Sequence, residues 1–251
     1  MSRIVLSTSV LAIVALALAP PALADWQEQD GHKMHFPQLP DPNGWDVDVT
    51  NNWMYDDWQC GGTGRVDDVH LWVSWQGGLV GQINRVHLEI WSDVPAGADT
   101  QVPFSHPGGV LWQGEFLPGK FIVGPPLAGV QGWYSPEAPT FVQEDHLQYF
   151  QLNIAGITAP FVQQIDTTYW LGVHIIPETA AVGPQPIVGW KTSLNHFNDD
   201  AAFFAAGQWH ELLDPVQVLP PVSLDMAFVI TPEPASLVLL TVGGLMLLRR
   251  R

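Results

Sequence analysis

The sequence contains a single cysteine, Cys60, among 251 residues. One cysteine cannot form a disulfide within the chain, so the fold must be stabilised by its core. The same shortage excludes paired-cysteine zinc sites. For Cys60 a buried free thiol is favoured over pairing with another chain, because unpaired cysteine behaves as a small apolar residue.

Basic residues are also scarce: nine Lys and Arg stand against twenty-five Asp and Glu, a formal net charge of −16. Four of the nine, Arg3 and the three terminal arginines, lie near the chain ends. Residues 25–234 therefore carry five basic residues against twenty-five acidic ones, a formal charge of −20. A surface this acidic repels nucleic acid, which is excluded as a partner, and attracts cations.

Helical periodicity is nearly absent as well. The chain has 22 prolines and 23 glycines, and only 196–206 is compatible with one short helical turn. Apolar residues instead alternate with polar ones, and turn residues separate the alternating runs. Leu117-Pro118-Gly119 looks like a hairpin join. This pattern predicts an all-β, antiparallel β-sandwich of jelly-roll type. The expected strands are 66–75, 84–91, 111–116, 120–123, 149–154, 168–176, 186–192, 208–212 and 223–230.

Sequence motifs for catalysis are missing too. The chain has no Gly-x-Ser-x-Gly elbow, no phosphate-binding glycine loop after a strand and no His-Glu-x-x-His. His32-x-x-His35 lies in a proline-rich segment without a carboxylate partner, so zinc is unsupported. A carboxylate pair for glycoside hydrolysis depends on the fold, and nothing distinguishes Glu89, Glu115 or Glu211 from surface residues. A non-enzyme is expected, with a glycan-acting hydrolase or lyase as the alternative.

The N-terminus has the features of a secretory signal peptide. Arg3 precedes the apolar run 4–19, and Ala22-Leu23-Ala24 places small residues where signal peptidase cleaves. We expect a signal helix over residues 1–24, cleavage before Asp25 and export. The alternative is a retained N-terminal anchor.

The C-terminus combines a short proline box, an apolar segment and a basic cluster. Pro232, Glu233 and Pro234 precede the uncharged run 235–248, and Arg249, Arg250 and Arg251 end the chain. Such a run predicts a short transmembrane helix, and the arginines would stay in the cytoplasm. Its fourteen residues span about 21 Å as a helix, short for a core of roughly 30 Å.

Thr231–Arg251 resembles the PEP-CTERM sorting signal of Gram-negative bacteria. The resemblance implies transient anchoring in the inner membrane, cleavage by an exosortase-type protease, and delivery to the cell surface or the exopolysaccharide matrix. An ordinary membrane anchor is the alternative.

Between the two ends, 25–45 is expected to be an extended lead-in and 46–230 the sandwich domain. This body resembles an uncharacterised family of secreted bacterial domains found beside PEP-CTERM tails, notably in planctomycete-like genomes. That resemblance implies no activity. It rests on Asp56-Asp57-Trp58-Gln59-Cys60, Val69-His70-Leu71-Trp72-Val73-Ser74-Trp75, Gln131-Gly132-Trp133-Tyr134 and Gly189-Trp190-Lys191-Thr192-Ser193.

Tryptophan is abundant, with twelve residues. Trp72, Trp91 and Trp170 alternate with the aliphatic residues of their strands, and His70 and His87 fall on the same faces. Indole rings stack on sugar rings, and nearby polar groups can orient hydroxyls. These five residues are therefore candidates for carbohydrate binding. The alternative is that the tryptophans fill space within the fold.

Acidic residues gather in pairs. Hard cations such as Ca²⁺ need six to eight oxygen ligands, and neighbouring carboxylates supply several. Asp56, Asp57, Asp199, Asp200 and Asp225 are candidates for a structural calcium site. The alternative is that they are solvated turn and capping residues.

Taken together, the sequence predicts an exported, non-catalytic surface or matrix protein that binds polysaccharide. A purely structural or adhesive envelope protein is a further alternative. The expected partners are signal peptidase, the exosortase-type protease and a polysaccharide, with no required cofactor other than the candidate calcium.

Overall fold

The structure, a computed structural model, describes residues 26–231, and the expected signal segment 1–24 and residues 232–251 of the expected sorting signal lie outside this range. The described part contains sixteen strands, one short 3₁₀ turn (η1, Gln76–Gly78) and no α-helix. It has no helix long and apolar enough to cross a membrane. The all-β prediction is confirmed for this part of the chain.

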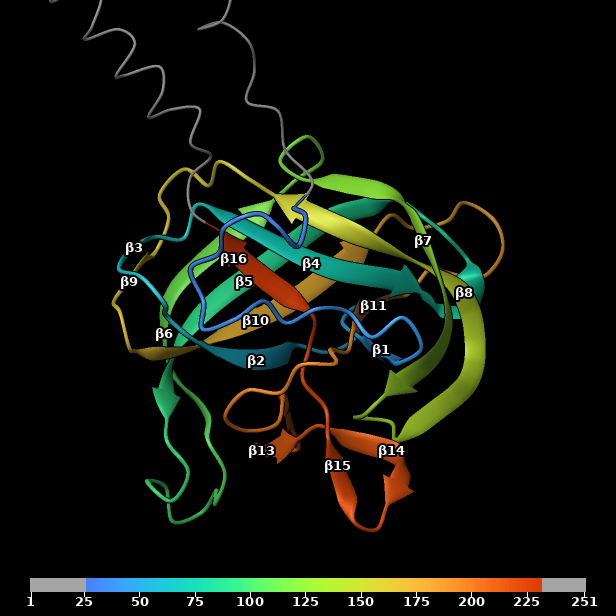
Figure 1. Ribbon diagram of the computed structural model, residues 1–251. Coiled ribbons are helices and arrows are strands. Elements are labelled where there is room, and N and C mark those ends of the chain that lie inside the picture. Colours follow the sequence, from blue (N-terminus) through green and yellow to red (C-terminus); the bar gives the residue numbers. More distant parts are fainter. Residues whose placement is uncertain (1–25, 232–251) are drawn as a thin grey trace, which may run out of the picture.

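Two six-stranded sheets form a sandwich-like arrangement (Figure 1). The β4 sheet has the order β11 (Val188–Lys191), β1 (Trp45–Asp48), β7 (Ile122–Ser135), β8 (Thr140–Ile154), β4 (Asp68–Trp75) and β16 (Phe228–Thr231). The β10 sheet has the order β13 (Gln208–Glu211), β12 (Ala202–Ala205), β2 (Met54–Gln59), β10 (Thr168–Pro177), β5 (Ile83–Val94) and β6 (His106–Phe116). Two small ladders join β3 (Gly64–Arg65) to β9 (Val162–Gln163) and β14 (Leu213–Val218) to β15 (Pro221–Ser223).

The core lies between the two sheets, where the alternation in the sequence places it. On β5 the residues Val86, Leu88 and Ile90 are buried in the core. Alternate residues of β10 and β4 are buried with them, because successive side chains of a strand point to opposite faces. The aliphatic stripes read from the sequence are therefore confirmed. Cys60 is a buried free thiol.

The β7–β8 hairpin is long and curves along one side of the sandwich (Figure 1). Three register shifts interrupt its ladder, which is how a strand bends. Beyond the bend β1 pairs with β7 in parallel, and β11 pairs with both β1 and β4. The strand pairs of the sandwich are thus antiparallel except for β1 and β7. A parallel pair needs a long connection, and β1 and β7 are far enough apart in sequence to allow it.

Two local expectations differ from the structure, and the lead-in makes contacts that the sequence did not indicate. Leu117-Pro118-Gly119 does not join a hairpin, because β6 and β7 belong to different sheets. Residues 196–206 form a loop and β12 instead of a helical turn. The lead-in packs onto the sandwich and makes isolated bridges to it at Met34, Gln38 and Pro40. Burial of Met34 and Gln38 fixes this segment to the domain.

Candidate functional site

The outer face of the β10 sheet carries a cluster of aromatic residues. Strand pairing aligns Gly172 of β10 with Glu89 of β5 and Tyr55 of β2. A Cβ on Gly172 would lie 2.6 Å from the Tyr55 ring. The absence of that side chain therefore lets the Tyr55 ring lie close over the strand, where it is 6% exposed.

Three tryptophans surround Tyr55. The Trp53 ring stacks beside it with a centroid separation of 6.1 Å. Trp91 and Trp209 meet it edge to face at 5.7 and 5.1 Å. All three tryptophans are half-buried, so part of each ring is open to solvent. Such aromatic surfaces are apolar and have fixed orientations.

Two histidines extend the cluster along the sheet. His174 stacks on Trp53 with centroids 5.2 Å apart, and His87 stacks on His174 at 5.7 Å. Burial lowers the pKa of His174, and the nearby His87 lowers it further. We call Trp53, Tyr55, His87, Trp91, His174 and Trp209 the aromatic face.

Glu89 supplies the polar centre of this face. Its carboxylate accepts hydrogen bonds from Trp91 Nε1 at 2.8 Å and from Gln113 Nε2 at 2.7 Å. Burial, followed by the charge and hydrogen bond of Glu89, raises the pKa of Tyr55. Tyr55 therefore keeps its proton at neutral pH. The carboxylate is held in one orientation by neighbouring donors.

The structure places the five carbohydrate-binding candidates on two different sheets. Trp91 and Trp170 pair across β5 and β10, and His87 lies on the same face. Trp170 is fully buried, and its Nε1 donates to Asp93 at 2.9 Å. Trp170 thus supports the aromatic face from below and has no surface for a sugar.

Trp72 and His70 lie on β4, in the other sheet, and this expectation is corrected. The lead-in residue Trp26 packs edge to face on Trp72 with centroids 6.1 Å apart, which leaves Trp72 only 4% exposed. His70 is buried and bonds Asn153 Oδ1 at 2.6 Å. Both residues are buried and present no exposed ring to a glycan. The sequence reasoning missed Trp53, Tyr55 and Trp209, which belong to short runs without clear alternation.

The acidic candidates lie on β2 and on the segments that lead into β12 and β16. Asp56 is fully buried and its Oδ2 accepts from Gln38 Nε2 at 2.8 Å and from the Met226 N–H at 2.6 Å. Asp225 accepts from the Phe197 N–H at 2.7 Å. Asp56 thus anchors the lead-in and the approach to β16 to β2, which is a structural role.

Asp199 and Asp200 come together with Glu211, which was not among the calcium candidates. One carboxylate oxygen of each lies within 4.8 Å of the other two. Burial, followed by the charges of Asp200 and Asp199, raises the pKa of Glu211. Burial also raises the pKa of Asp200, and neighbouring carboxylates add to the effect. Negative charges have been brought close together here.

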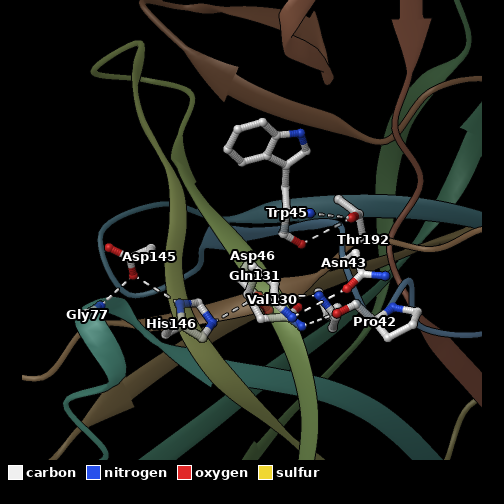
Figure 2. A network of polar contacts seen from close by, with 11 residues as sticks. Pro42, Asn43, Trp45, Asp46, Gly77, Val130, Gln131, Asp145, His146 and Thr192 are labelled. Carbon is white, nitrogen blue, oxygen red and sulfur yellow. Dashed lines mark hydrogen bonds and ion pairs between the residues drawn. The ribbon is translucent and has the colours of Figure 1, made fainter.

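A second polar network lies inside the β4 sheet, where β7 and β8 curve over β1 (Figure 2). His146 lies between two aspartates, with Nε2 3.1 Å from Asp46 Oδ2 and Nδ1 3.0 Å from Asp145 Oδ2. Lys191 Nζ is 3.4 Å from the same Asp46 oxygen. The Gln131 side chain donates to the Pro42 carbonyl.

The network is closed to substrates. The side chains of Asp46, His146 and Lys191 are 0–1% exposed. Burial lowers the pKa of His146, but the hydrogen bonds and charges of Asp46 and Asp145 outweigh it, so the pKa is raised. The network therefore connects the β7–β8 hairpin to β1 and β11 through buried polar contacts rather than hydrophobic packing.

Neither a search of curated proteins nor a search of solved structures found a match to this chain. One family profile, described as a domain of unknown function (DUF7901), matches residues 34–231. The match covers both sheets, the aromatic face and most of the lead-in, and the chain belongs to the DUF7901 family.

Proposed function

We propose that this chain is an exported, non-catalytic surface or matrix protein that binds a neutral polysaccharide on the aromatic face. The observation that carries the proposal is the group of half-buried Trp53, Trp91 and Trp209 rings around Tyr55. Sugar rings offer flat C–H surfaces that pack on indole. Their hydroxyls need hydrogen-bond partners at the same place, and Glu89 and Gln113 provide polar groups there.

A neutral glycan fits the charge of the molecule better than an acidic one. The sequence has a formal net charge of −16, and a carboxylate, Glu89, lies at the centre of the aromatic face. Asp199, Asp200 and Glu211 add negative charge beside it. Uronic acids or phosphates would be repelled over about 8–10 Å at physiological salt.

The test measures binding of the purified chain to an array of neutral and uronic-acid polysaccharides. Trp53→Ala, Trp91→Ala and Trp209→Ala should each weaken binding by about 30-fold, because an aromatic residue central to binding contributes about 2 kcal/mol or more. Phe141→Ala is the matched control, since Phe141 is an exposed ring (46%) on β8, in the other sheet. Its binding should be unchanged.

Two outcomes would contradict the proposal: no neutral glycan binds, or the three variants bind as well as the parent while remaining folded by circular dichroism. Release of reducing ends from a bound glycan, abolished by Glu89→Gln, would favour the hydrolase alternative. Binding without release supports the non-catalytic role.

The route to the surface rests on the sequence. We infer that the signal segment is removed and that Thr231–Arg251 is recognised as a PEP-CTERM signal by an exosortase-type protease after transient membrane anchoring. We also infer a jelly-roll arrangement for the sandwich. Cell fractionation with mass spectrometry of both termini tests the route. Glu233→Ala should leave the chain in the inner membrane, whereas an unchanged surface location would contradict sorting through this box.

A further inference from the structure

The carboxylates beside the aromatic face have the arrangement of a cation site. Glu211 lies on β13 and pairs with Ala202 of β12, and Ala202 pairs with Tyr55 of β2. Asp199 and Asp200 directly precede β12. Three acidic side chains from two segments therefore converge at one edge of the face, with one oxygen each within 4.8 Å of the others.

This spacing suits a large divalent ion. Calcium binds oxygen at about 2.3–2.6 Å, so two of its ligands lie at most roughly 5 Å apart. One oxygen from each of Asp199, Asp200 and Glu211 lies within about this reach of the other two. Calcium is favoured over magnesium because calcium accepts six to eight oxygens in a flexible geometry, whereas magnesium demands a near-ideal octahedron and keeps several of its waters.

The charges of these carboxylates are not neutralised by basic residues. Among residues 26–231, no Lys or Arg forms an ion pair with Asp199, Asp200 or Glu211. The neighbouring titratable basic residue is His196, whose Nδ1 is 3.4 Å from Asp225 Oδ1. An added cation would relieve a repulsion that the fold leaves in place.

A second observation comes from Asp57 on β2. Asp57 is fully buried, and its Oδ1 has no hydrogen-bond partner in the described part of the chain. Its Oδ2 accepts a hydrogen bond at 2.6 Å from Nδ2 of Asn198, the residue that precedes Asp199. Burial raises the pKa of Asp57, and the charge of Asp199 contributes to this effect.

A buried carboxylate oxygen without a donor costs free energy unless it faces a proton or a cation. The antiparallel pairing of Tyr55 with Ala202 places Asp57 opposite the segment that holds Asp199 and Asp200. The buried Asp57 carboxyl thus lies next to the acidic group, to which its hydrogen bond with Asn198 connects it.

We propose that Asp199, Asp200 and Glu211 bind one Ca²⁺ at the edge of the aromatic face, with Asp57 next to the acidic group. Backbone carbonyls and water complete the coordination. Asp56 is outside the site because it is fully buried and is not one of the three carboxylates that converge. Asp199 is held in place by hydrogen bonds from the N–H groups of Ser105 and Asp200. This proposal does not rest on glycan binding, and its test uses the metal alone.

The experiment titrates CaCl₂ into the metal-free full-length chain by calorimetry at physiological salt. We expect one ion per chain with a dissociation constant of about 0.1–1 mM, as in other extracellular modules. Asp200→Asn and Glu211→Gln should each weaken binding at least about tenfold. Glu115→Gln is the matched control, because Glu115 lies on β6 of the same sheet and pairs with Arg85. It should leave binding unchanged.

Terbium provides a second readout, because it replaces calcium and emits when a nearby indole transfers energy to it. Trp209 lies two residues before Glu211 on the same strand. Trp209→Phe should therefore reduce terbium emission without changing calcium affinity. Thermal melting without metal checks that Asp200→Asn and Glu211→Gln are folded. We expect their metal-free stability to be no lower than that of the parent chain, because each substitution removes a charge that repels its neighbours.

Absence of saturable calcium binding to the parent chain would overturn the proposal. So would calcium binding or terbium emission that is unchanged in a folded Asp200→Asn/Glu211→Gln double variant. Loss of binding in that variant, with Glu115→Gln unaffected, would support it. Each result is obtained without a glycan and is independent of the polysaccharide proposal.

Discussion

Replacing Lys191 by methionine tests the buried network described in Figure 2. Lys191 is fully buried on β11, with Nζ 3.4 Å from Asp46 Oδ2 and 5.3 Å from the centre of the Tyr149 ring. Methionine keeps a similar length and apolar stem but removes the charge. Asp46 would then remain buried with the His146 ring as its titratable neighbour.

Removing one partner of a buried ion pair costs about 3–5 kcal/mol, because the other charge is left uncompensated. For a domain of this size 1 kcal/mol shifts Tm by about 2–4 °C. We therefore expect Lys191→Met to lower Tm by roughly 6–20 °C. The exposed Lys120 offers a control, since Lys120→Met should change the free energy of unfolding by less than about 0.5 kcal/mol.

The loss should depend on pH through His146. The folded-state pKa of His146 is raised above 6.5, so the stability gained from its protonation is complete below pH 6.5 and is lost as pH rises through the folded pKa. Without Lys191, protonated His146 is the cation that compensates Asp46. The destabilisation should accordingly be smaller near pH 6 than near pH 8.5.

Urea unfolding of parent and variant, followed by tryptophan fluorescence at both pH values, measures this difference. Adding His146→Gln to Lys191→Met should remove the pH dependence of the loss. The reasoning is refuted if Lys191→Met costs less than about 1 kcal/mol, or if its cost is the same at both pH values.

Three further variants test the packing of the two outer faces and the acidic group. Gly172→Ala should cost about 1–3 kcal/mol of stability and weaken glycan binding, because its Cβ would press on Tyr55; unchanged binding would show that the ring position does not matter. Trp72→Ala should cost about 3–5 kcal/mol without affecting binding, and a loss of binding in the folded variant would contradict the covered position beneath Trp26. Asp57→Asn should stabilise the metal-free chain at neutral pH, because the folded pKa of Asp57 is raised. That gain should shrink as the pH falls through the raised pKa of Asp57 toward 3.8. Chemical denaturation of parent and variant across this pH range measures the gain, and equal stabilities at neutral pH would contradict the prediction.

Much of the fold can be predicted from alternation alone. Val86, Leu88 and Ile90 point inward as expected, because the side-chain period of a strand is two whatever its neighbours are. Trp91 and His87 lie on the opposite face for the same reason. The Leu117-Pro118-Gly119 turn was assigned correctly as a turn and wrongly as a hairpin, since turn residues do not specify which sheet the next strand joins.

The candidate sites depend on contacts between distant residues. Trp53 and Trp209 meet at Tyr55 only because β2 pairs with β10 and also with β12. Trp72 is covered because the lead-in returns over β4, which no local pattern encodes. Glu211 joins Asp199 and Asp200 through the β12–β13 pairing.

Residue type and local order sufficed to predict the strand character and the inward stripes, which the structure confirms. The export and sorting segments are likewise read from local order, and they stay predictions. Tertiary structure alone decided which tryptophans remain open to solvent and which carboxylates meet. Strand pairing joins residues more than a hundred positions apart, as with Asp46 and Lys191, and local periodicity carries no information about such pairings.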